Sequence, residues 1–593
     1  MTVGGSAQIV LFMVVLVAAA VPLGAYMARV YSGEPVLLSR VLGPVERGAY
    51  RLLRVDPGRT MDWKAWARAI VVFSLVGWLA LYLVLRTQSL HPWASYGLSG
   101  GAKFKSAPWD VTFNTVSSFV TNTNWQYYAG ESTLTYFSQM VGLTVQNFLS
   151  AAVGIVVAIA LIRGIVGREG KSLGNFWQDL VRTILYVLAP LAGIGALVLV
   201  SQGVLQNIAH SLSVTGPTGL SQTIAQGPVA SQEAIKLLGT NGGGFFNVNS
   251  AHPFENPNGF TNFFEMLLVL VIPAALVLTY GRLVGSRRQG YAIFATMSVL
   301  FLAGVVVAYA AEAHGSPAQH AAGLHTHVLA GSTGGNLEGK EQRFGIAGSA
   351  LFDVVTTVTS CGAVNSALES FTGIGGAIPF ANLSASEVIF GGVGTGLYSM
   401  LLFVLLAVFI GGLMVGRTPE LLGKKIEAKE IKLVTLGLLM TPLSALAASA
   451  LASADHDGRA SISANAAATP QGFSETFYAY LSQANNNGSA FAGYTGYVNS
   501  VGNLGAHTSY RFADVLGGFT MLFARFAPIV FALAVAGALA GKRVSPAGLG
   551  TMRTDNATFV VLLIGVIILV GALTFFPALL LGPIVQGLTG HLY

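Results

Sequence analysis

Residues 121–124 read Thr121, Asn122, Thr123 and Asn124, a short polar box in an otherwise apolar chain. Three further boxes follow it: Thr240, Asn241, Gly242 and Gly243; Thr359, Ser360, Cys361 and Gly362; and Asn485, Asn486, Asn487 and Gly488. Their starts at 121, 240, 359 and 485 are 119, 119 and 126 residues apart, which predicts one unit repeated four times. Four such loops around one axis would place rings of backbone carbonyls about a dehydrated cation.

The composition indicates a polytopic membrane protein. Of 593 residues, 53% are hydrophobic and only 10% are charged, whereas soluble proteins carry about 25% charged residues. Apolar runs long enough to cross about 30 Å of hydrocarbon recur along the chain. We predict ten spans, at 7–29, 66–86, 133–162, 180–202, 262–281, 291–312, 386–416, 433–453, 517–541 and 557–582. The single cysteine excludes an internal disulfide framework.

Lysine and arginine predict the orientation of these spans. On one side of the predicted topology lie 23 of the 32 basic residues, eight lie on the other, and Arg525 falls inside a span. Because basic loops stay in the cytoplasm, we expect both termini and all four boxes on the extracytoplasmic side of a cell membrane. The first span is expected to be retained, because Met1 to Gln8 carries no lysine or arginine of a signal peptide.

The predicted fold is all-α, with four pseudo-symmetric helix–pore loop–helix repeats and one extra span at each end. The expected parts are 1–30, an extra span; 31–65, a cytoplasmic connector; 66–164, 165–290, 291–430 and 431–550, the repeats; and 551–593, the second extra span.

A short apolar stretch precedes each box, at 108–120, 229–239, 348–358 and 472–484, and predicts a re-entrant helix. Each carries an acid, expected near the helix start: Asp110, Glu233, Asp353 and Glu475. The negative helix end would then point at the box and favour a cation there. Simple N-terminal capping is the alternative role for the acids, and ordinary surface turns are the alternative for a single box.

Within the boxes, small residues let carbonyls line up without obstruction. Asn122, Asn241 and Asn486 are candidates to brace the loops from behind, and Cys361 is expected to be a small residue of the ring rather than a metal ligand.

The boxes resemble the four filter segments of the potassium-binding subunits of bacterial Kdp pumps, the KdpA family. The matching stretches are TNTNWQ at 121–126, GTNGGGFFN at 239–247, TSCGAVNS at 359–366 and NNNGSAFAG at 485–493. This resemblance implies that the sixteen box residues bind K⁺ from outside, and that an intramembrane tunnel passes it to a P-type ATPase subunit (KdpB-like). It also implies a single-span accessory subunit (KdpC-like) and, in some complexes, a very small KdpF-like peptide, all in the bacterial inner membrane.

The resemblance further implies a gate. Gly391, Gly392, Gly394 and Gly396 make the seventh span too glycine-rich for an uninterrupted helix. Helices of this superfamily are broken at the corresponding place, under the filter, whereas close helix packing is the alternative reading. Arg525, deep in its span, would repel onward K⁺; bracing a carbonyl or reaching the outer interface is the alternative.

We expect no catalytic site and no organic cofactor in this chain. It lacks an Asp-Lys-Thr-Gly segment and a G-x-x-x-x-G-K-[ST] loop, so ATP would be used by the partner subunit. Partners are expected to include the lipid bilayer and no nucleic acid. A stand-alone channel or symporter similar to the Trk and Ktr families is the alternative function.

Overall fold

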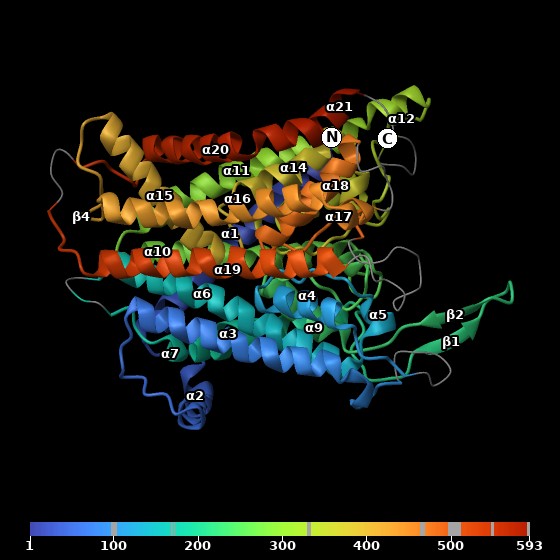
Figure 1. Ribbon diagram of the computed structural model, residues 1–593, viewed down its shortest axis with the longest axis horizontal. Coiled ribbons are helices and arrows are strands. Elements are labelled where there is room, and N and C mark those ends of the chain that lie inside the picture. Colours follow the sequence, from blue (N-terminus) through green and yellow to red (C-terminus); the bar gives the residue numbers. More distant parts are fainter. Residues whose placement is uncertain are drawn as a thin grey trace.

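The computed structural model describes residues 1–95, 103–167, 170, 172–328, 334–462, 469–495, 511–546 and 551–589. Within these ranges, ten helices are long and apolar enough to cross a membrane, and the protein is accordingly a multi-pass membrane protein. They run side by side along the long axis of the molecule (Figure 1). The ten are α1 (Val3–Ser32), α3 (Trp63–Arg86), η3 with α6 (Ser138–Thr144 and Val145–Val166), α7 with η4 and α8 (Phe176–Arg182, Thr183–Leu188 and Ala189–Ser201), α10 (Gly259–Leu283), α11 (Arg287–His314), α15 (Thr395–Met414), α16 (Ala428–Ala454), α19 (Arg511–Ala540) and α20 (Ala557–Leu579).

The remaining elements are short. Those that precede the boxes are α4 (Trp109–Val120), α9 (Val229–Leu238), α13 (Gly345–Val358) and α18 (Pro470–Ala484). The others are α2 (Ser39–Leu53), η1 (Gln88–Leu90), α5 (Gly130–Thr133), η5 (Asn249–Ala251), α12 (Pro317–Ala321), η6 (Leu368–Ser370), α14 (Gly373–Ser384), α17 (His456–Ala460), η7 (Leu580–Ile584) and α21 (Val585–Thr589).

Two small antiparallel strand pairs depart from the all-α prediction. One pairs β1 (Leu212–Thr215) with β2 (Ser221–Ile224), and Leu212 faces Ile224 across the ladder. The other pairs β3 (Glu420–Leu421) with β4 (Lys424–Lys425). Because both lie in connections, they leave the helical bundle unchanged.

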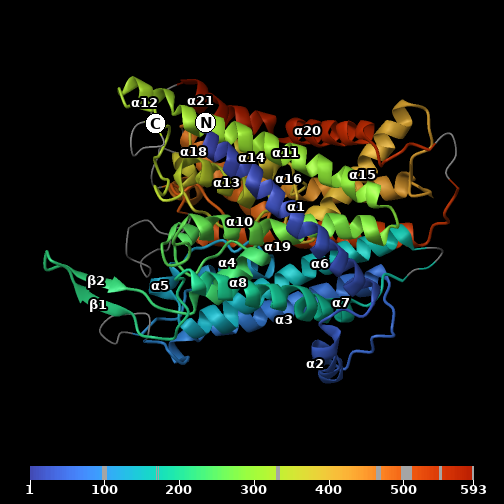
Figure 2. The ribbon, with the colours of Figure 1, turned by 180° about the vertical axis from the view of Figure 1, so that it is seen from behind.

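The core of the bundle is formed by α6 and α10, whose apolar residues are almost all buried. α1 packs along α10, and α19 packs against α6 and α16. Figure 2 shows α1 running across the back of the bundle. Local capping fixes several starts: Asp62 accepts a hydrogen bond from the Ala65 N–H at α3, and Asn258 and Thr261 form a capping box at α10.

Both chain ends, the four short helices before the boxes and the β1–β2 hairpin lie toward one end of the molecule (Figures 1 and 2). The predicted topology requires this arrangement, since ten crossings return the chain to the side on which it began.

One predicted span is wrong in its extent. The seventh, expected at 386–416, is helical only from Thr395 onward, and residues 385–394 form an irregular connection between α14 and α15. Three residues of this segment have positive φ angles: Ser386 (57°), Glu387 (61°) and Phe390 (60°). Residues other than glycine rarely adopt this backbone conformation. Gly391, Gly392 and Gly394 therefore lie in a true helix break, as the glycine content predicts, whereas Gly396 is the second residue of α15.

Candidate functional site

Each of the four short helices ends immediately before a box, at Val120, Leu238, Val358 and Ala484. The second residue after each helix end adopts a left-handed conformation: Asn122 (72°), Thr240 (46°), Ser360 (48°) and Asn486 (50°). This shared geometry aligns 121–124 with 239–242, 359–362 and 485–488. The second box therefore begins at Gly239, one residue earlier than its sequence pattern suggests, and Gly243 follows the aligned segment.

The first and second boxes are joined by asparagine side chains. The Asn122 amide donates to the carbonyls of Gly239 and Thr240, at 3.1 and 3.0 Å. Its Oδ1 accepts from Asn241 Nδ2 at 2.6 Å and from Ser150 Oγ at 2.7 Å. Both the nitrogen and the oxygen of the Asn122 side-chain amide are thus hydrogen-bonded, and these bonds hold the two boxes in one relative position.

The second and third boxes meet at Cys361. Its thiol donates to the Asn241 carbonyl at 2.8 Å, and a Cβ built on Gly242 would come within 2.6 Å of the Cys361 carbonyl. The buried cysteine therefore serves as a small residue at a backbone crossing, where a larger one would push the boxes apart.

The ring is closed by the fourth box. Asn487 donates to the carbonyl of Thr356, at the end of α13, at 3.1 Å, and its own carbonyl occupies the space where a Cβ on Gly362 would lie. Asn486 donates to Thr123 Oγ1 at 2.9 Å. The Thr123 carbonyl likewise fills the Cβ position of Gly488.

The four predicted boxes therefore come together, and the contacts pass from the first box to the second, third and fourth and back to the first. Gly362 (φ 86°) and Gly488 (φ 97°) combine a left-handed backbone with a neighbouring carbonyl in the Cβ position, so only glycine fits there. All box residues are buried except Gly488, which is half-buried.

The acids of the four short helices differ from the prediction in their placement. Asp110 is the second residue of α4, but Glu233, Asp353 and Glu475 are the fifth, ninth and sixth residues of their helices. Capping of the helix start is therefore wrong for these three. All four acids are at most 1% exposed.

A buried charged cluster supports the second box and was missed by sequence reasoning. Lys236 Nζ, with no exposed side-chain surface, lies 2.7 Å from Glu233 and 3.2 Å from Glu255. It also donates to Asn249 Oδ1 at 2.6 Å, and the amide nitrogen of Asn249 donates to the Gly242 carbonyl. Lys236 itself was the signal in the sequence. A lysine in a short apolar stretch that enters the membrane requires buried partners for its charge.

A histidine beside this cluster adds no positive charge. His252 stacks on Phe246 with ring centroids 3.8 Å apart. Burial, reinforced by the positive charge of Arg343, lowers the pKa of His252 to about 4. The imidazole is therefore neutral near pH 7.

The break at 385–394 touches the boxes directly. The Gly391 N–H donates to the Val358 carbonyl at 3.1 Å, and the Val393 N–H donates to Thr240 Oγ1 at 3.0 Å. Both partners lie where a short helix turns into its box. The irregular segment thus lies against the turns at which the second and third boxes begin.

Arg525 lies beside the same break. It is 4% exposed, and its Nη1 donates to Thr395 Oγ1 at 2.7 Å, at the first residue of α15. Its side chain therefore neither reaches an outer interface nor braces a carbonyl through this contact. Gly394 packs against the Gly154 backbone of α6, and a Cβ built on Gly154 would lie 3.2 Å from Arg525 Nη2.

The sequence is similar to known proteins over nearly its whole length. Residues 10–588 match the family model described as potassium-transporting ATPase A subunit. A potassium-transporting ATPase potassium-binding subunit from Methylobacterium nodulans is 54% identical over 590 residues, covering 100% of this chain and 98% of the relative. Proteins of the same description from Methylorubrum extorquens and Rhodospirillum centenum are each 52% identical, over 100% and 99% of this chain and 98% of each relative.

Proposed function

Because the chain belongs to the family of potassium-transporting ATPase A subunits, we propose that it binds K⁺ at the ring of four boxes and delivers it to an ATP-hydrolysing partner. The observation that carries this proposal is the closed circle of contacts among the four boxes, made by segments up to 363 residues apart in sequence. A circle of backbone turns can surround one ion, which no single box can do.

Selection follows from replacing water by carbonyl oxygen. K⁺ sheds its hydration shell only where oxygens of suitable number and dipole take over. The asparagine and cysteine contacts hold the turns from behind, and the glycines allow the backbones to approach. The four short helices end at the boxes, so their negative ends favour a cation in the ring.

We propose that the break at 385–394 controls the onward passage of K⁺. The gate consists of the cation Arg525 and four glycines, Gly391, Gly392, Gly394 and, at the start of α15, Gly396. A fixed buried charge beside this break repels K⁺ that would otherwise continue straight through. The ion then leaves sideways, through an intramembrane tunnel, to a P-type ATPase subunit.

The proposal extends to the assembly and its place in the cell. We place the chain in a bacterial inner membrane with extracytoplasmic termini, together with KdpB-like and KdpC-like subunits and a KdpF-like peptide. The four repeats at 66–164, 165–290, 291–430 and 431–550 are part of this proposal, as are the flanking segments at 1–30, 31–65 and 551–593.

The test is the K⁺ dependence of ATP hydrolysis by the complex carrying Gly362→Ala. The added methyl group meets the Asn487 carbonyl in a left-handed backbone, so we expect the K⁺ concentration for half-maximal activity to rise at least about tenfold. Gly203→Ala is the matched control, because Gly203 has a φ of 95° and open space around its Cβ position. Equal K⁺ dependence in both variants contradicts binding at the ring.

A stand-alone Trk-like or Ktr-like channel or symporter is the alternative, and one experiment separates the two. The purified chain alone is placed in liposomes without ATP and K⁺ uptake is measured. Our proposal expects no sustained flux until the ATPase subunit and ATP are supplied. Rapid uptake by the chain alone supports the alternative.

A further inference from the structure

The connector between α1 and α3 contains a helix that the sequence analysis did not anticipate. α2 (Ser39–Leu53) is held to the bundle by Glu46. That carboxylate accepts from Arg182 Nε at 2.9 Å, from Tyr50 at 2.7 Å and from Tyr186 at 2.7 Å. Burial alone would raise the pKa of Glu46, but these hydrogen bonds outweigh it and lower the pKa below its ordinary value of 4.5. The anchor is therefore charged and intact at neutral pH.

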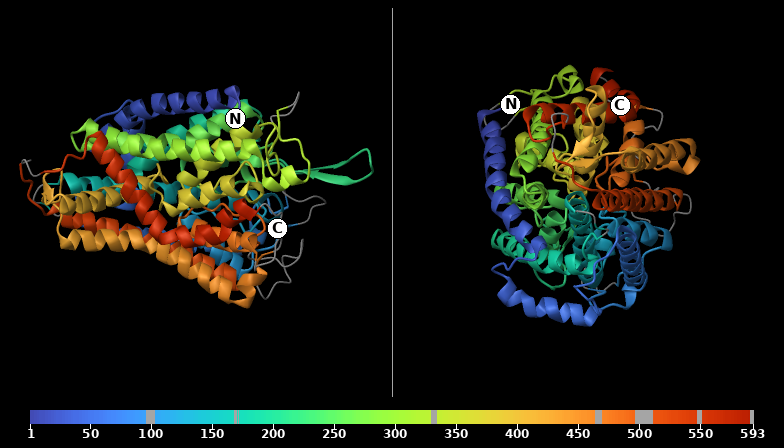
Figure 3. Two further views of the ribbon diagram at one scale, coloured as in Figure 1. Left: turned by 90° about the horizontal axis from the view of Figure 1, so that it is seen from above. Right: turned by 90° about the vertical axis from the view of Figure 1, so that its left-hand side faces the viewer.

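The anchor fixes the level at which α2 lies. Arg182 and Tyr186 belong to the first turns of the apolar span that begins at Phe176, where a transmembrane helix passes from hydrocarbon to headgroups. Figure 3, right, shows α2 lying flat outside the bundle, across the direction of the spans. A helix at this level and in this orientation lies in the plane of a membrane surface.

The side chains of α2 divide into three faces. Gly43 and Tyr50 are buried toward the protein, with Glu46 beside them. A second face is apolar and open: Val41, Val45 and Leu52 are 71%, 52% and 84% exposed.

The third face is basic, with Arg40, Arg47 and Arg51 all exposed. At 100° per residue these arginines lie about 120° from the apolar face. This pattern is typical of helices that bury one side in the acyl boundary and bind anionic headgroups with the other.

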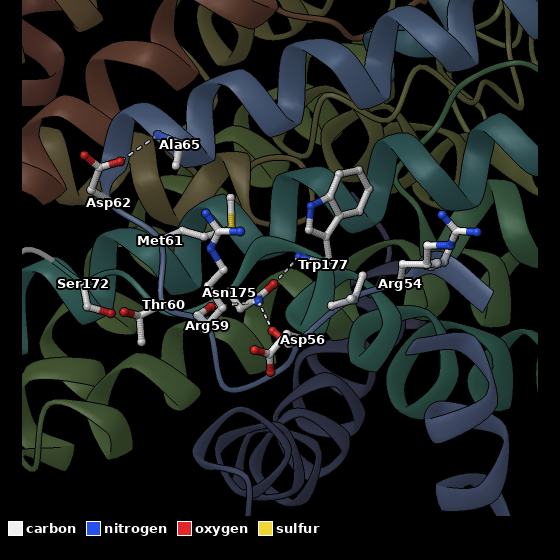
Figure 4. A pocket seen from close by; sticks show the side chains of 12 residues that line it. Arg54, Asp56, Arg59, Thr60, Met61, Asp62, Ala65, Ser172, Asn175 and Trp177 are labelled. Carbon is white, nitrogen blue, oxygen red and sulfur yellow. Dashed lines mark hydrogen bonds between the residues drawn. The ribbon is translucent and has the colours of Figure 1, made fainter. Parts of the chain in front are cut away.

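A hollow of about 950 Å³ adjoins the C-terminal end of α2 (Figure 4). Its lining includes Arg54 and Arg59, but also Asp56 and Asp62, so its formal charges cancel. The hollow therefore offers no preference for an anion, and the attraction resides on the outer face of the helix.

We propose that α2 is a membrane-surface helix that binds anionic phospholipid, with Val41, Val45 and Leu52 among the acyl chains and Arg40, Arg47 and Arg51 on the headgroup phosphates. Three exposed cations complement the negative surface of a phosphatidylglycerol-containing leaflet.

The first test measures the depth of the helix. The full chain has one cysteine, Cys361, and it is buried, so a fluorophore attaches selectively at Val45→Cys or at Arg47→Cys. In phosphatidylcholine–phosphatidylglycerol nanodiscs carrying an acyl-chain nitroxide, we expect strong quenching at position 45 and weak quenching at 47. Equal quenching at both positions, or none at 45, overturns the proposal; protection of position 45 only after adding the ATPase subunit indicates a protein-docking face instead.

The second test measures the lipid preference. With the nitroxide on phosphatidylglycerol at a low mole fraction, quenching at Val45→Cys reports enrichment of that lipid around α2. Replacing Arg40, Arg47 and Arg51 by glutamine is expected to lower the affinity at least about tenfold. Neutralising the exposed Arg417, Lys429 and Lys432 is the matched control and should leave it unchanged. Equal loss in both triple variants, or no loss in either, overturns the assignment of the arginines.

Discussion

Asn122 is the residue through which the first two boxes hold each other. Its amide makes four buried hydrogen bonds, to two carbonyls, one asparagine and one serine. Asn122→Ala leaves these groups without their partner, at about 1–3 kcal/mol for each buried polar group. We expect the K⁺ concentration for half-maximal ATPase activity to rise at least about tenfold. Asn207→Ala, which removes an asparagine bonded within the connection between α8 and α9, should leave this concentration unchanged. A rise in both variants contradicts a specific role of Asn122.

We propose that Arg525 acts through its charge and that its hydrogen bond to Thr395 makes a separate contribution. Arg525→Gln keeps a donor for Thr395 Oγ1 and removes the cation beside the boxes. We expect a passive, ATP-independent K⁺ leak through the complex in liposomes. Thr395→Val removes the hydrogen-bonding partner and retains the charge, so it should not leak. If Thr395→Val leaks K⁺ and Arg525→Gln does not, packing at the break, and not the charge of Arg525, forms the barrier to passive K⁺ flow.

At the scale of elements, α9 depends on Lys236 and its two carboxylates. Lys236→Met leaves Glu233 and Glu255 buried without their cation, which costs about 3–5 kcal/mol. We expect a clear fall in the thermal unfolding temperature of the purified complex, together with weaker K⁺ binding, because Asn249 loses its support.

Two comparisons check that interpretation. Arg29→Met removes an ion pair whose side chains are 56% and 59% exposed, so it should change stability little. Adding Glu233→Gln and Glu255→Gln to Lys236→Met removes the unpaired charges and should restore most of the lost stability. If Lys236→Met is as stable as the unchanged chain, the cluster of Lys236, Glu233 and Glu255 does not support the second box.

The extents of the helices were predicted well where hydrophobic length decides them. The predicted stretches 108–120 and 472–484 correspond to α4 (Trp109–Val120) and α18 (Pro470–Ala484). The seventh span was predicted to start too early, at 386, although the glycines between 391 and 396 had indicated an interrupted helix. Contacts with α13 and the second box hold residues 386–394 away from a helical conformation. The prediction also missed α2, because a basic connector gives little hydrophobic signal.

For the whole molecule, the arrangement of basic loops predicts the orientation in the membrane. Alkaline phosphatase fused after Gly219, in the β1–β2 hairpin, or at the C-terminus should be active, because that enzyme matures only outside the cytoplasm. Fusions after Gly285 or Gly423, in the basic connections at the other end, should be inactive. Activity after Gly285 would reverse the predicted topology.

The sequence by itself determined the spans, apart from the start of the seventh, together with the short helices and the position of the four boxes to within one residue. These are local properties, since a bilayer demands about twenty apolar residues for each crossing and a box interrupts an apolar pattern wherever it occurs. Only the tertiary structure decided how the boxes meet: the register of the second box from Gly239, the bracing by Asn122, and the cluster around Lys236. The physical reason is that these contacts join residues more than a hundred positions apart, or depend on where a buried side chain finds its partner. A local sequence pattern predicts neither the long-range contacts nor the partner of a buried side chain.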